Sequence, residues 1–307
     1  MINYNKLAKQ PLMFKRFTGL SVKEFQNLYK KIKSNYNNSE VQRLSNRKRK
    51  RAVGAGRRFQ LNLIDRLLML LVYYRLYLVF SLMGFLFELN QSNVHRDIKY
   101  LEPLVKQSIP LAEKMKERTK KISTLKELFK YYPEMRAFVD ATEQEIPRPK
   151  NKKKRRKYYS GKKKRHAVKT QIVVNKKGII LDNSKHHEGK KHDYSIFKEE
   201  TPEVPKDVEL GGDLGYEGMK RDFADMKTKI PHKKPKGGKL SKKQKRFNKK
   251  FSRERIVVEH AIRKIKEFKI IGNEYRNKLK SYDSSFSITA GLVNFTTMQR
   301  NNINLPY

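Results

Sequence analysis

The chain has 307 residues and carries 73 lysines and arginines against 30 aspartates and glutamates, a formal net charge of +43. This imbalance makes nucleic acid the first candidate partner and an anionic membrane surface the second, because a compact fold with such charge repels itself without a polyanion. The absence of cysteine excludes disulfides and thiolate zinc sites, and the 10% aromatic content argues against a merely disordered basic tail.

The first predicted helix covers residues 20–33, where Ser21 and Glu24 have the spacing of a capping box. Residues 35–56 then lose helical periodicity and contain the basic run 47–51. A solvated linker is one interpretation of this stretch. Another is a flexible basic arm, at about 35–60, that follows a DNA groove.

Residues 67–87 are nearly all apolar and about long enough to span a bilayer. Arg75 near their centre costs roughly 2.5–3.5 kcal/mol in a membrane, even on a lenient insertion scale. We therefore expect two buried helices, 61–78 and 79–89, and no membrane association.

A third helix is predicted at residues 90–102, ended by Pro103. Val94, Ile98 and Leu101 form its apolar stripe. The polar side chains on the other side are Gln91, Asn93, His95, Arg96 and Lys99. This order is typical of a helix-turn-helix at about 61–105 whose second helix enters the major groove. An ordinary helical core with a solvated face is the alternative, and the net charge favours DNA.

A charged helical connector is predicted at 111–132, and a buried strand follows to about residue 146. Within that strand, the apolar run of residues 137–139 stops at Asp140. Residues 148–165 are predicted to form a basic loop that contacts phosphates and stacks on bases; a disordered hairpin tip is the alternative. The candidate DNA-binding residues of this loop are Tyr158, Tyr159, Lys162, Lys163 and Arg165.

The remaining pattern predicts a mixed α/β domain. The expected elements are strands 167–174, 179–181 and 208–214, a short edge strand 230–236, and helices 192–200, 240–271 and 285–298. We therefore expect a helical DNA-binding domain at 1–110, a connector at 111–135 and an α/β domain at 136–307.

Three carboxylates are expected to converge in this second domain: Asp140, Asp213 at a later strand end, and Glu259 on the long helix. Hard oxygen ligands suit Mg²⁺ or Mn²⁺, and three carboxylates can hold two such ions for phosphoryl transfer. The alternative for Glu259 alone is an ion network on the helix surface with Arg255 and Arg263.

Other groups are weaker metal candidates. Asp193 begins a predicted helix and is more simply a capping residue, although it remains a further candidate ligand. His186, His187 and His192 are irregularly spaced and are better explained as solvated loop residues than as a zinc site.

Together these motifs resemble the DDE-type insertion-sequence transposases related to PIF/Harbinger elements, over about residues 18–298. The matching segments are Val139-Asp140-Ala141-Thr142, residues 158–166, His192-Asp193, Gly212-Asp213-Leu214-Gly215-Tyr216-Glu217-Gly218 and Val257-Val258-Glu259-His260. Arg255, Glu259 and Lys266 also fit the R-(3)-E-(6)-K signature of related transposases, with Ser252 where that signature often has Tyr.

The resemblance implies an RNase H-like mixed sheet flanked by helices and preceded by an all-α helix-turn-helix domain. Asp140, Asp213 and Glu259 match the catalytic acids, while Arg255 and Lys266 resemble groups that contact the transposon end. Glu88 stands where the turn of the helix-turn-helix often has Gly.

We accordingly expect a cytoplasmic, nucleoid-associated DNA transposase that uses two Mg²⁺ or Mn²⁺ ions. It would bind terminal inverted repeats and target DNA as a homodimer or larger assembly, and catalyse strand cleavage and strand transfer. A catalytically silent DNA-binding protein derived from a transposase is the alternative, and a basic RNA-binding protein is a third.

Overall fold

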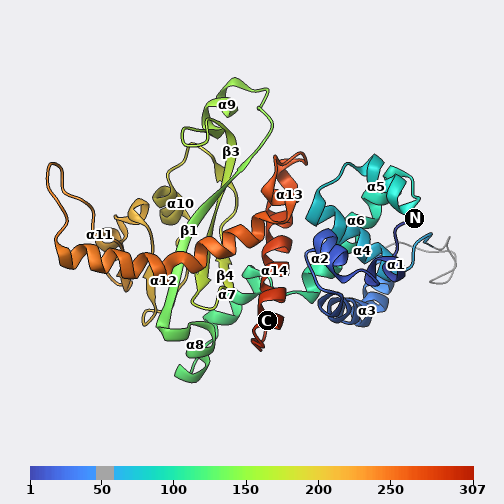
Figure 1. Ribbon diagram of the computed structural model, residues 1–307, viewed down its shortest axis with the longest axis horizontal. Helices are drawn as coiled ribbons and strands as arrows, with labels where there is room; N and C mark the ends of the chain where they lie inside the picture. The colour runs from blue at the N-terminus through green and yellow to red at the C-terminus, as the bar shows by residue number, and fades with distance from the viewer. Residues whose placement is uncertain (46–58) are drawn as a thin grey trace. The chain divides into compact units, whose positions relative to one another are not determined.

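A computed structural model describes residues 1–45 and 59–307 (Figure 1). The chain forms two compact units. The first comprises Met1–Ile109 and Glu267–Ile270, and the second comprises Pro110–Lys266 and Ile271–Tyr307.

The first unit is helical, and its central helix is buried along most of its length. Its helices are α1 (Tyr4–Ala8), α2 (Pro11–Thr18), α3 (Val22–Ser45), α4 (Leu63–Leu76), α5 (Phe80–Phe87) and α6 (Gln91–Ser108). The α4 residues from Asp65 to Tyr74 are all buried, which explains why α4 is apolar on every side. The predicted capping box forms, because the Ser21 amide donates to Glu24 and the Glu24 amide donates back to Ser21 Oγ.

Helix α3 extends well beyond its predicted end at residue 33. The extension packs against α6: the Tyr36 and Tyr100 rings meet edge to face, and the Tyr100 hydroxyl donates to Glu40. These tertiary contacts compensate for the weak periodicity of residues 35–45, so the predicted arm does not begin there. Its remaining part, residues 46–58, lies outside the described residues.

The apolar stretch at 67–87 divides into α4 and α5 at Tyr77, which has a left-handed backbone (φ 53°). In the described part of the chain, no helix combines the length and the hydropathy that crossing a membrane requires.

A tight turn joins α5 to α6, as a helix-turn-helix requires. Glu88 adopts the left-handed conformation there (φ 54°), and the Leu89 amide donates to the Gly84 carbonyl at 2.9 Å. The prediction that Pro103 ends the next helix is wrong. Helix α6 continues to Ser108 because Leu104 and Val105 extend its buried stripe beyond the proline.

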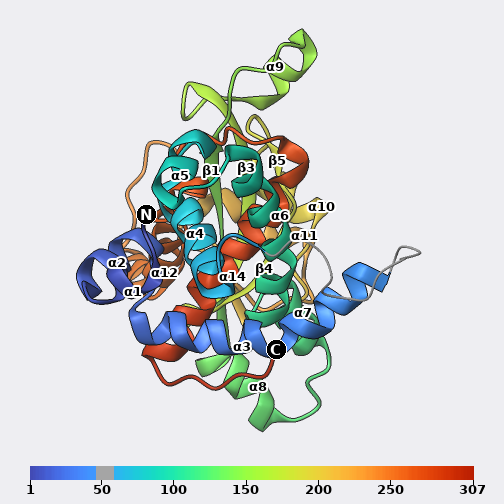
Figure 2. The same ribbon diagram turned by 90° about the vertical axis from the view of Figure 1, so that its right-hand side faces the viewer.

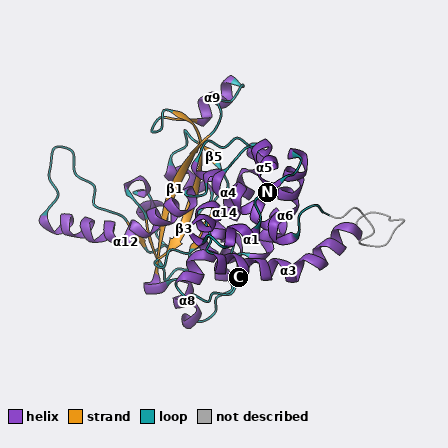
Figure 3. Ribbon diagram, turned by 45° about the vertical axis from the view of Figure 1, so that its right-hand side comes forward, coloured by secondary structure: helices purple, strands orange, loops and turns teal. Residues whose placement is uncertain are grey.

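The second unit begins with α7 (Ala112–Lys120) and α8 (Leu125–Tyr131), so the predicted connector is two helices. They lead into a mixed sheet, whose strands are orange in Figure 3. Its strand order is β2-β3-β1-β6-β7, and β4 and β5 also pair with β3. The strands are β1 (Arg136–Glu145), β2 (Tyr159–Ser160), β3 (Arg165–Asn175), β4 (Ile180–Asn183), β5 (His187–Glu188), β6 (Glu209–Gly211) and β7 (Thr228–Lys229). The first strand pairs antiparallel with β3 and parallel with β6.

Helices cover both faces of this sheet (Figure 2). On one face, Phe251 of α12 (Lys242–Lys266) lies against Phe138. On the other, Phe197 of α10 (Asp193–Glu199) joins a core with Val139 and Val173. Alternation along β1 explains this division, because Phe138 and Val139 face opposite sides. The remaining helices are α9 (Lys152–Tyr158), α11 (Met219–Asp222), α13 (Lys269–Gly272) and α14 (Tyr282–Arg300).

The helix predicted at 240–271 is divided, because α12 ends at Lys266 and α13 is separate, and the strand predicted at 208–214 pairs only over Glu209–Gly211. Two further predicted segments differ from the observed ones. The basic loop 148–165 contains α9 and β2. The edge strand is Thr228–Lys229 instead of residues 230–236, because only those two residues pair with β6. Figure 1 shows α9 at the far end of the ribbon formed by β1 and β3.

Candidate active site

Asp140 and Asp213 each lie two residues after the last pair of the parallel β1–β6 ladder. The β1–β6 ladder ends with Phe138 opposite Gly211, and each aspartate follows two residues later. Asp140 remains within β1, opposite Ile172 of β3, whereas Asp213 has already left β6. The two carboxylates therefore lie near each other where parallel strands separate, a common position for functional groups in α/β sheets.

The turn after β6 orients Asp213. Its Oδ1 accepts from the Gly215 amide at 2.8 Å, so Asp213 caps the short 3-10 helix η2 (Leu214–Tyr216). Glycine is required at position 211, where an added Cβ would lie 2.9 Å from Phe138 and 3.0 Å from Phe251. The absence of a side chain allows α12 to pack close to the aspartates.

Arg255 on α12 connects two of the three acids. Its Nη1 lies 3.1 Å from Asp140 Oδ2, and its Nη2 lies 2.7 Å from Glu259 Oε1. Glu259 follows Arg255 by four residues and therefore lies on the same helix face. Its side chain is 52% exposed, whereas that of Arg255 is 16% exposed.

Burial raises the pKa of the Asp140 carboxyl, and the nearby Asp213 charge raises it further. The Arg255 guanidinium and the Ala141 amide, which donates to Oδ1 at 2.8 Å, oppose this effect. Asp140 thus has the environment of a functional carboxylate: desolvated, beside a second acid and held by one cation.

Tyr216 belongs to the same site, although the sequence interpretation did not select it. Its hydroxyl is buried without a hydrogen-bond partner among residues 1–45 and 59–307. Burial, followed by the charges of Asp193, Asp140 and Asp213, raises the pKa of this phenol well above its ordinary value. An aromatic three residues after a candidate acid was the available signal, but it is equally typical of core packing.

Asp193 begins α10 and lies in a chain of polar contacts. Its Oδ1 is 3.0 Å from Lys169 Nζ, and the same ammonium lies 3.5 Å from Glu143 Oε1. Glu143 also accepts from Ser160 Oγ at 2.6 Å, and its carbonyl accepts from Lys266 Nζ at 3.1 Å. Burial lowers the pKa of the Lys266 ammonium, and Lys163 and Lys162 act in the same direction. Lys169 gave no sequence signal, because it lies within the alternation of β3.

The candidate DNA-binding residues of α6 all lie on its exposed side: Gln91, Asn93, His95, Arg96 and Lys99. In the 148–165 segment Tyr158 is half-buried, whereas Tyr159, Lys162, Lys163 and Arg165 are exposed. Arg263 is exposed on α12.

The loop histidines have separate partners instead of a common centre. His186 contacts Asp283 at 2.9 Å, and His187 contacts Glu200 at 2.8 Å.

Carboxylate oxygens suit Mg²⁺ or Mn²⁺, and Asp140, Asp213 and Glu259 supply them from β1, the turn after β6, and α12. With the side chains as they lie in the described ranges, no three carboxylate or imidazole groups are close enough to hold an ion. Arg255 contacts both Asp140 and Glu259, so an ion would have to replace the guanidinium between them. The donor chemistry fits a divalent cation once Arg255 turns away.

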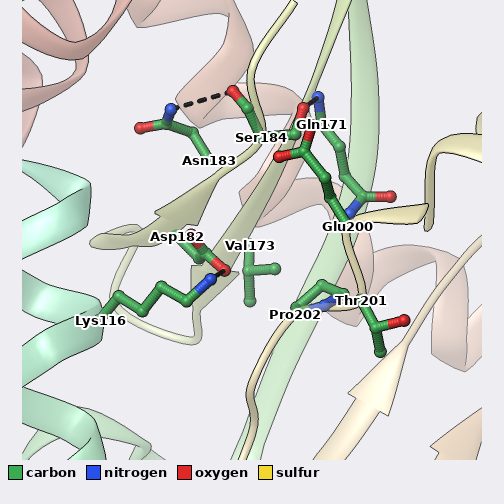
Figure 4. A pocket seen from close by; sticks show the side chains of 9 residues that line it. All are labelled: Lys116, Gln171, Val173, Asp182, Asn183, Ser184, Glu200, Thr201 and Pro202. Carbon is green, nitrogen blue, oxygen red and sulfur yellow. Dashed lines mark hydrogen bonds and ion pairs between the residues drawn. The ribbon is translucent and has the colours of Figure 1, made fainter. Parts of the chain in front are cut away.

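A separate polar pocket of about 130 Å³ lies on the opposite sheet face (Figure 4). Gln171 and Val173 line it, and they alternate with Ile172, the residue opposite Asp140. Lys116 and Asp182 form an ion pair of 3.1 Å beside it. The pocket contains none of the three acids.

Comparison with known proteins gives two family matches. Residues 139–294, which include the three acids, match a family described as DDE superfamily endonuclease. Residues 59–111 match one described as the helix-turn-helix of DDE superfamily endonuclease. A protein named "Probable transposase for insertion sequence element IS702" from Microchaete diplosiphon is 31% identical over 282 residues, covering 92% of this chain and 93% of that protein. No solved structure matches the chain with comparable significance.

Proposed function

The chain belongs to the DDE superfamily of endonucleases, as an insertion-sequence transposase with an N-terminal helix-turn-helix, and we propose that it cleaves its element's DNA ends and transfers them to target DNA. In this proposal Asp140, Asp213 and Glu259 are the catalytic residues. The observation that carries it is the meeting of β1, the turn after β6, and α12 at one polar centre. Arg255 joins Asp140 to Glu259, and the charge of the third acid, Asp213, acts on Asp140.

Asp140, Asp213 and Glu259 would hold the divalent ions, with Asp193 as a further candidate ligand. Two bound Mg²⁺ or Mn²⁺ ions would supply the Lewis acidity that activates the attacking oxygen and stabilises the leaving oxygen in phosphoryl transfer.

Arg255 has a second role in this proposal. In the free protein its guanidinium keeps Asp140 and Glu259 at one place and partly neutralises them. When the acids bind cations, the released guanidinium can pair with a phosphate of the transposon end, for which its planar donor pattern is suited. Lys266 and Arg263 lie further along α12 and would contact the same backbone.

The first unit would select the DNA. The exposed side of α6 carries amide, imidazole and guanidinium groups that read base edges in the major groove, while the buried side holds the helix in its unit. Two element ends require two sites, so we propose a homodimer or larger assembly on DNA.

The test is strand cleavage of a labelled duplex carrying the native element end, with Mg²⁺ or Mn²⁺. Wild type is compared with Asp140→Asn, Asp213→Asn and Glu259→Gln. Metal-dependent cuts at the repeat boundary that vanish in all three variants are expected, with DNA binding retained. Cleavage that survives the substitutions would show that other acids are catalytic.

A DNA-binding protein that has lost catalysis is the second candidate. It predicts equally tight binding by all four proteins and no cleavage at any metal concentration. The retained carboxylate centre argues against it, because binding alone does not need desolvated acids. An RNA-binding protein would bind without preference for a DNA end.

A further inference from the structure

Four cations and an aromatic ring surround an open pocket of about 630 Å³ between α9, β2 and the loop after β5. Its lining residues are Arg148, Arg155, Arg156, Tyr159, Gly161, His166 and Lys190. The size is within the range of about 300–1,000 Å³ found for ligand pockets. Among the residues that the structure describes, no carboxylate lines it.

The cations of this pocket lack anionic partners. Arg148, Arg155, Arg156 and Lys190 form no ion pair within residues 1–45 and 59–307, and the buried Nε of Arg155 has no hydrogen-bond partner there. The nearest acids along the chain are paired elsewhere, Glu145 with Arg165 at 3.4 Å and Glu188 with Lys157 at 3.9 Å. The pocket is therefore complementary to an anion.

The exposed ring of Tyr159 indicates that the ligand also has a planar group that can stack on it. Tyr159 is 42% exposed and meets the His166 ring edge to face at 5.7 Å. Backbone contacts hold the surrounding loop: the Lys190 amide donates to the Lys157 carbonyl at 3.1 Å, and the Gly189 amide to Ala167 at 2.9 Å. A planar apolar group and a phosphate can thus bind side by side in a pocket whose walls are already formed.

We propose that this pocket binds an unpaired nucleotide of the DNA substrate, with its base on Tyr159 and its phosphate among the arginines. Base stacking on an aromatic side chain combined with a basic groove is the chemistry of single-strand recognition. A base within a duplex cannot present its face to Tyr159, so the pocket selects DNA that is opened or unpaired. The inference rests on the proposed function only in taking DNA as the substrate.

The sheet fixes the distance from the candidate catalytic acids. Tyr159 pairs with His166, whose carbonyl accepts from the Ile146 amide. Ile146 lies six residues beyond Asp140, which corresponds to about 20 Å along a strand. For DNA that follows β1, the unpaired nucleotide would lie about six base steps from the cleaved phosphate, at about 3.4 Å per step.

Binding to a gapped duplex tests the proposal. The probe is a labelled end duplex with a four-nucleotide unpaired stretch centred six positions from the cut, and its fully paired counterpart is the reference. Fluorescence anisotropy at fixed salt, without metal, should give about tenfold tighter binding of the full-length protein to the gapped probe. Tyr159→Ala should bring this ratio close to one, and Tyr159→Phe should keep it.

A charge-matched pair separates the pocket from the general basic surface. Arg155→Gln should lower the ratio, whereas Lys154→Gln, on the exposed side of α9, should weaken both probes equally. A ratio near one in wild type, or one that survives Tyr159→Ala, would overturn the proposal. If the protein cleaves at the repeat boundary but binds both probes equally, only this inference is wrong. If it prefers the gapped probe but does not cleave, the nucleotide pocket stands and the proposed catalytic function is wrong.

Discussion

Glu88 adopts a backbone conformation that glycine adopts at little cost. Its φ of 54° places it in the left-handed region, where a side chain is disfavoured. The turn still forms because the Gln60 side chain donates to the Glu88 carbonyl at 2.9 Å and Leu89 bonds back to Gly84. The departure from the family's glycine therefore leaves the turn intact.

We expect Glu88→Gly to raise the Tm of the first unit by about 2–4 °C, because it removes this backbone strain. Thermal denaturation followed by circular dichroism would measure the change. Glu88→Ala is the matched control, since it removes the carboxylate and keeps the Cβ. An equal gain from alanine would show that the carboxylate, instead of the backbone, is unfavourable.

Arg255 changes the pKa of Asp140 through a direct contact of 3.1 Å. Burial and Asp213 raise the pKa of Asp140, and the guanidinium lowers it. In Arg255→Gln the opposing charge is gone, so the pKa of Asp140 should rise further and the carboxylate should form only at higher pH. Carbon-13 NMR titration of aspartate-labelled, metal-free protein would detect this shift.

Arg253→Gln is the control for this titration, because Arg253 is exposed on the same helix. It removes an equal charge without touching the acids and should leave the Asp140 titration close to that of wild type. Identical curves for all three proteins would contradict the role assigned to Arg255.

A buried ion pair between Arg66 and Asp97 joins helices α4 and α6. Arg66 is 1% exposed, lies 3.0 Å from Asp97 and stacks 3.5 Å from the Phe59 ring centroid. Burial raises the pKa of Asp97, and Arg66 opposes that shift. The pair holds α6, the helix proposed to read DNA, against the buried helix α4.

Asp97→Ala should lower the free energy of unfolding of the first unit by about 3 kcal/mol, because it leaves a guanidinium buried without its partner. Urea denaturation would measure the loss. Arg96→Ala, at the adjacent but exposed position, should change stability by less than about 0.5 kcal/mol. Similar effects of the two substitutions would argue against a structural role for the pair.

The elements predictable from sequence are those with a strong apolar pattern. Helices α4, α5 and α14 and strands β1 and β3 fall close to their predicted positions, because burial dictates their residues. Helix α9 escaped prediction because Lys152–Tyr158 has no apolar stripe, and the extension of α3 depends on contacts with α6 that local sequence does not encode.

Some residues of the candidate site could also be predicted from the sequence, and others could not. Asp140, Asp213 and Glu259 could be selected from strand ends, glycines and helix spacing. Tyr216 and Lys169 were not selected. An aromatic residue near an acid is equally typical of core packing, and only the fold brings Lys169 to Asp193 and Glu143. The edge strand was misplaced because Ile230 is apolar for core packing, whereas pairing with β6 occurs two residues earlier.

At the scale of the whole molecule, we expect the charge of +43 to govern the affinity for DNA. If the protein makes six to ten phosphate contacts, binding should weaken by about 10³–10⁵ between 50 and 200 mM salt. Filter binding or anisotropy over a salt series would give the slope. A flat dependence would rule out phosphate contact as the main source of affinity.

Chelation should separate binding from catalysis. With EDTA, cleavage of the end duplex should fall to background while affinity changes less than about twofold, because the α6 and α9 surfaces need no ion. Restoring Mg²⁺ should restore the cuts. Cleavage that persists in EDTA would exclude a divalent-ion mechanism.

Glu259 contributes little to the fold, since half of its side chain faces solvent and its carboxylate pairs with Arg255 on its own helix. A mutated gene copy lacking this acid should therefore yield a stable chain that still occupies element ends. Under the proposed function, such a chain would compete with intact copies and block assemblies that need two working sites. An element that multiplies would, by accumulating defective copies, produce its own inhibitor and slow its spread through a genome.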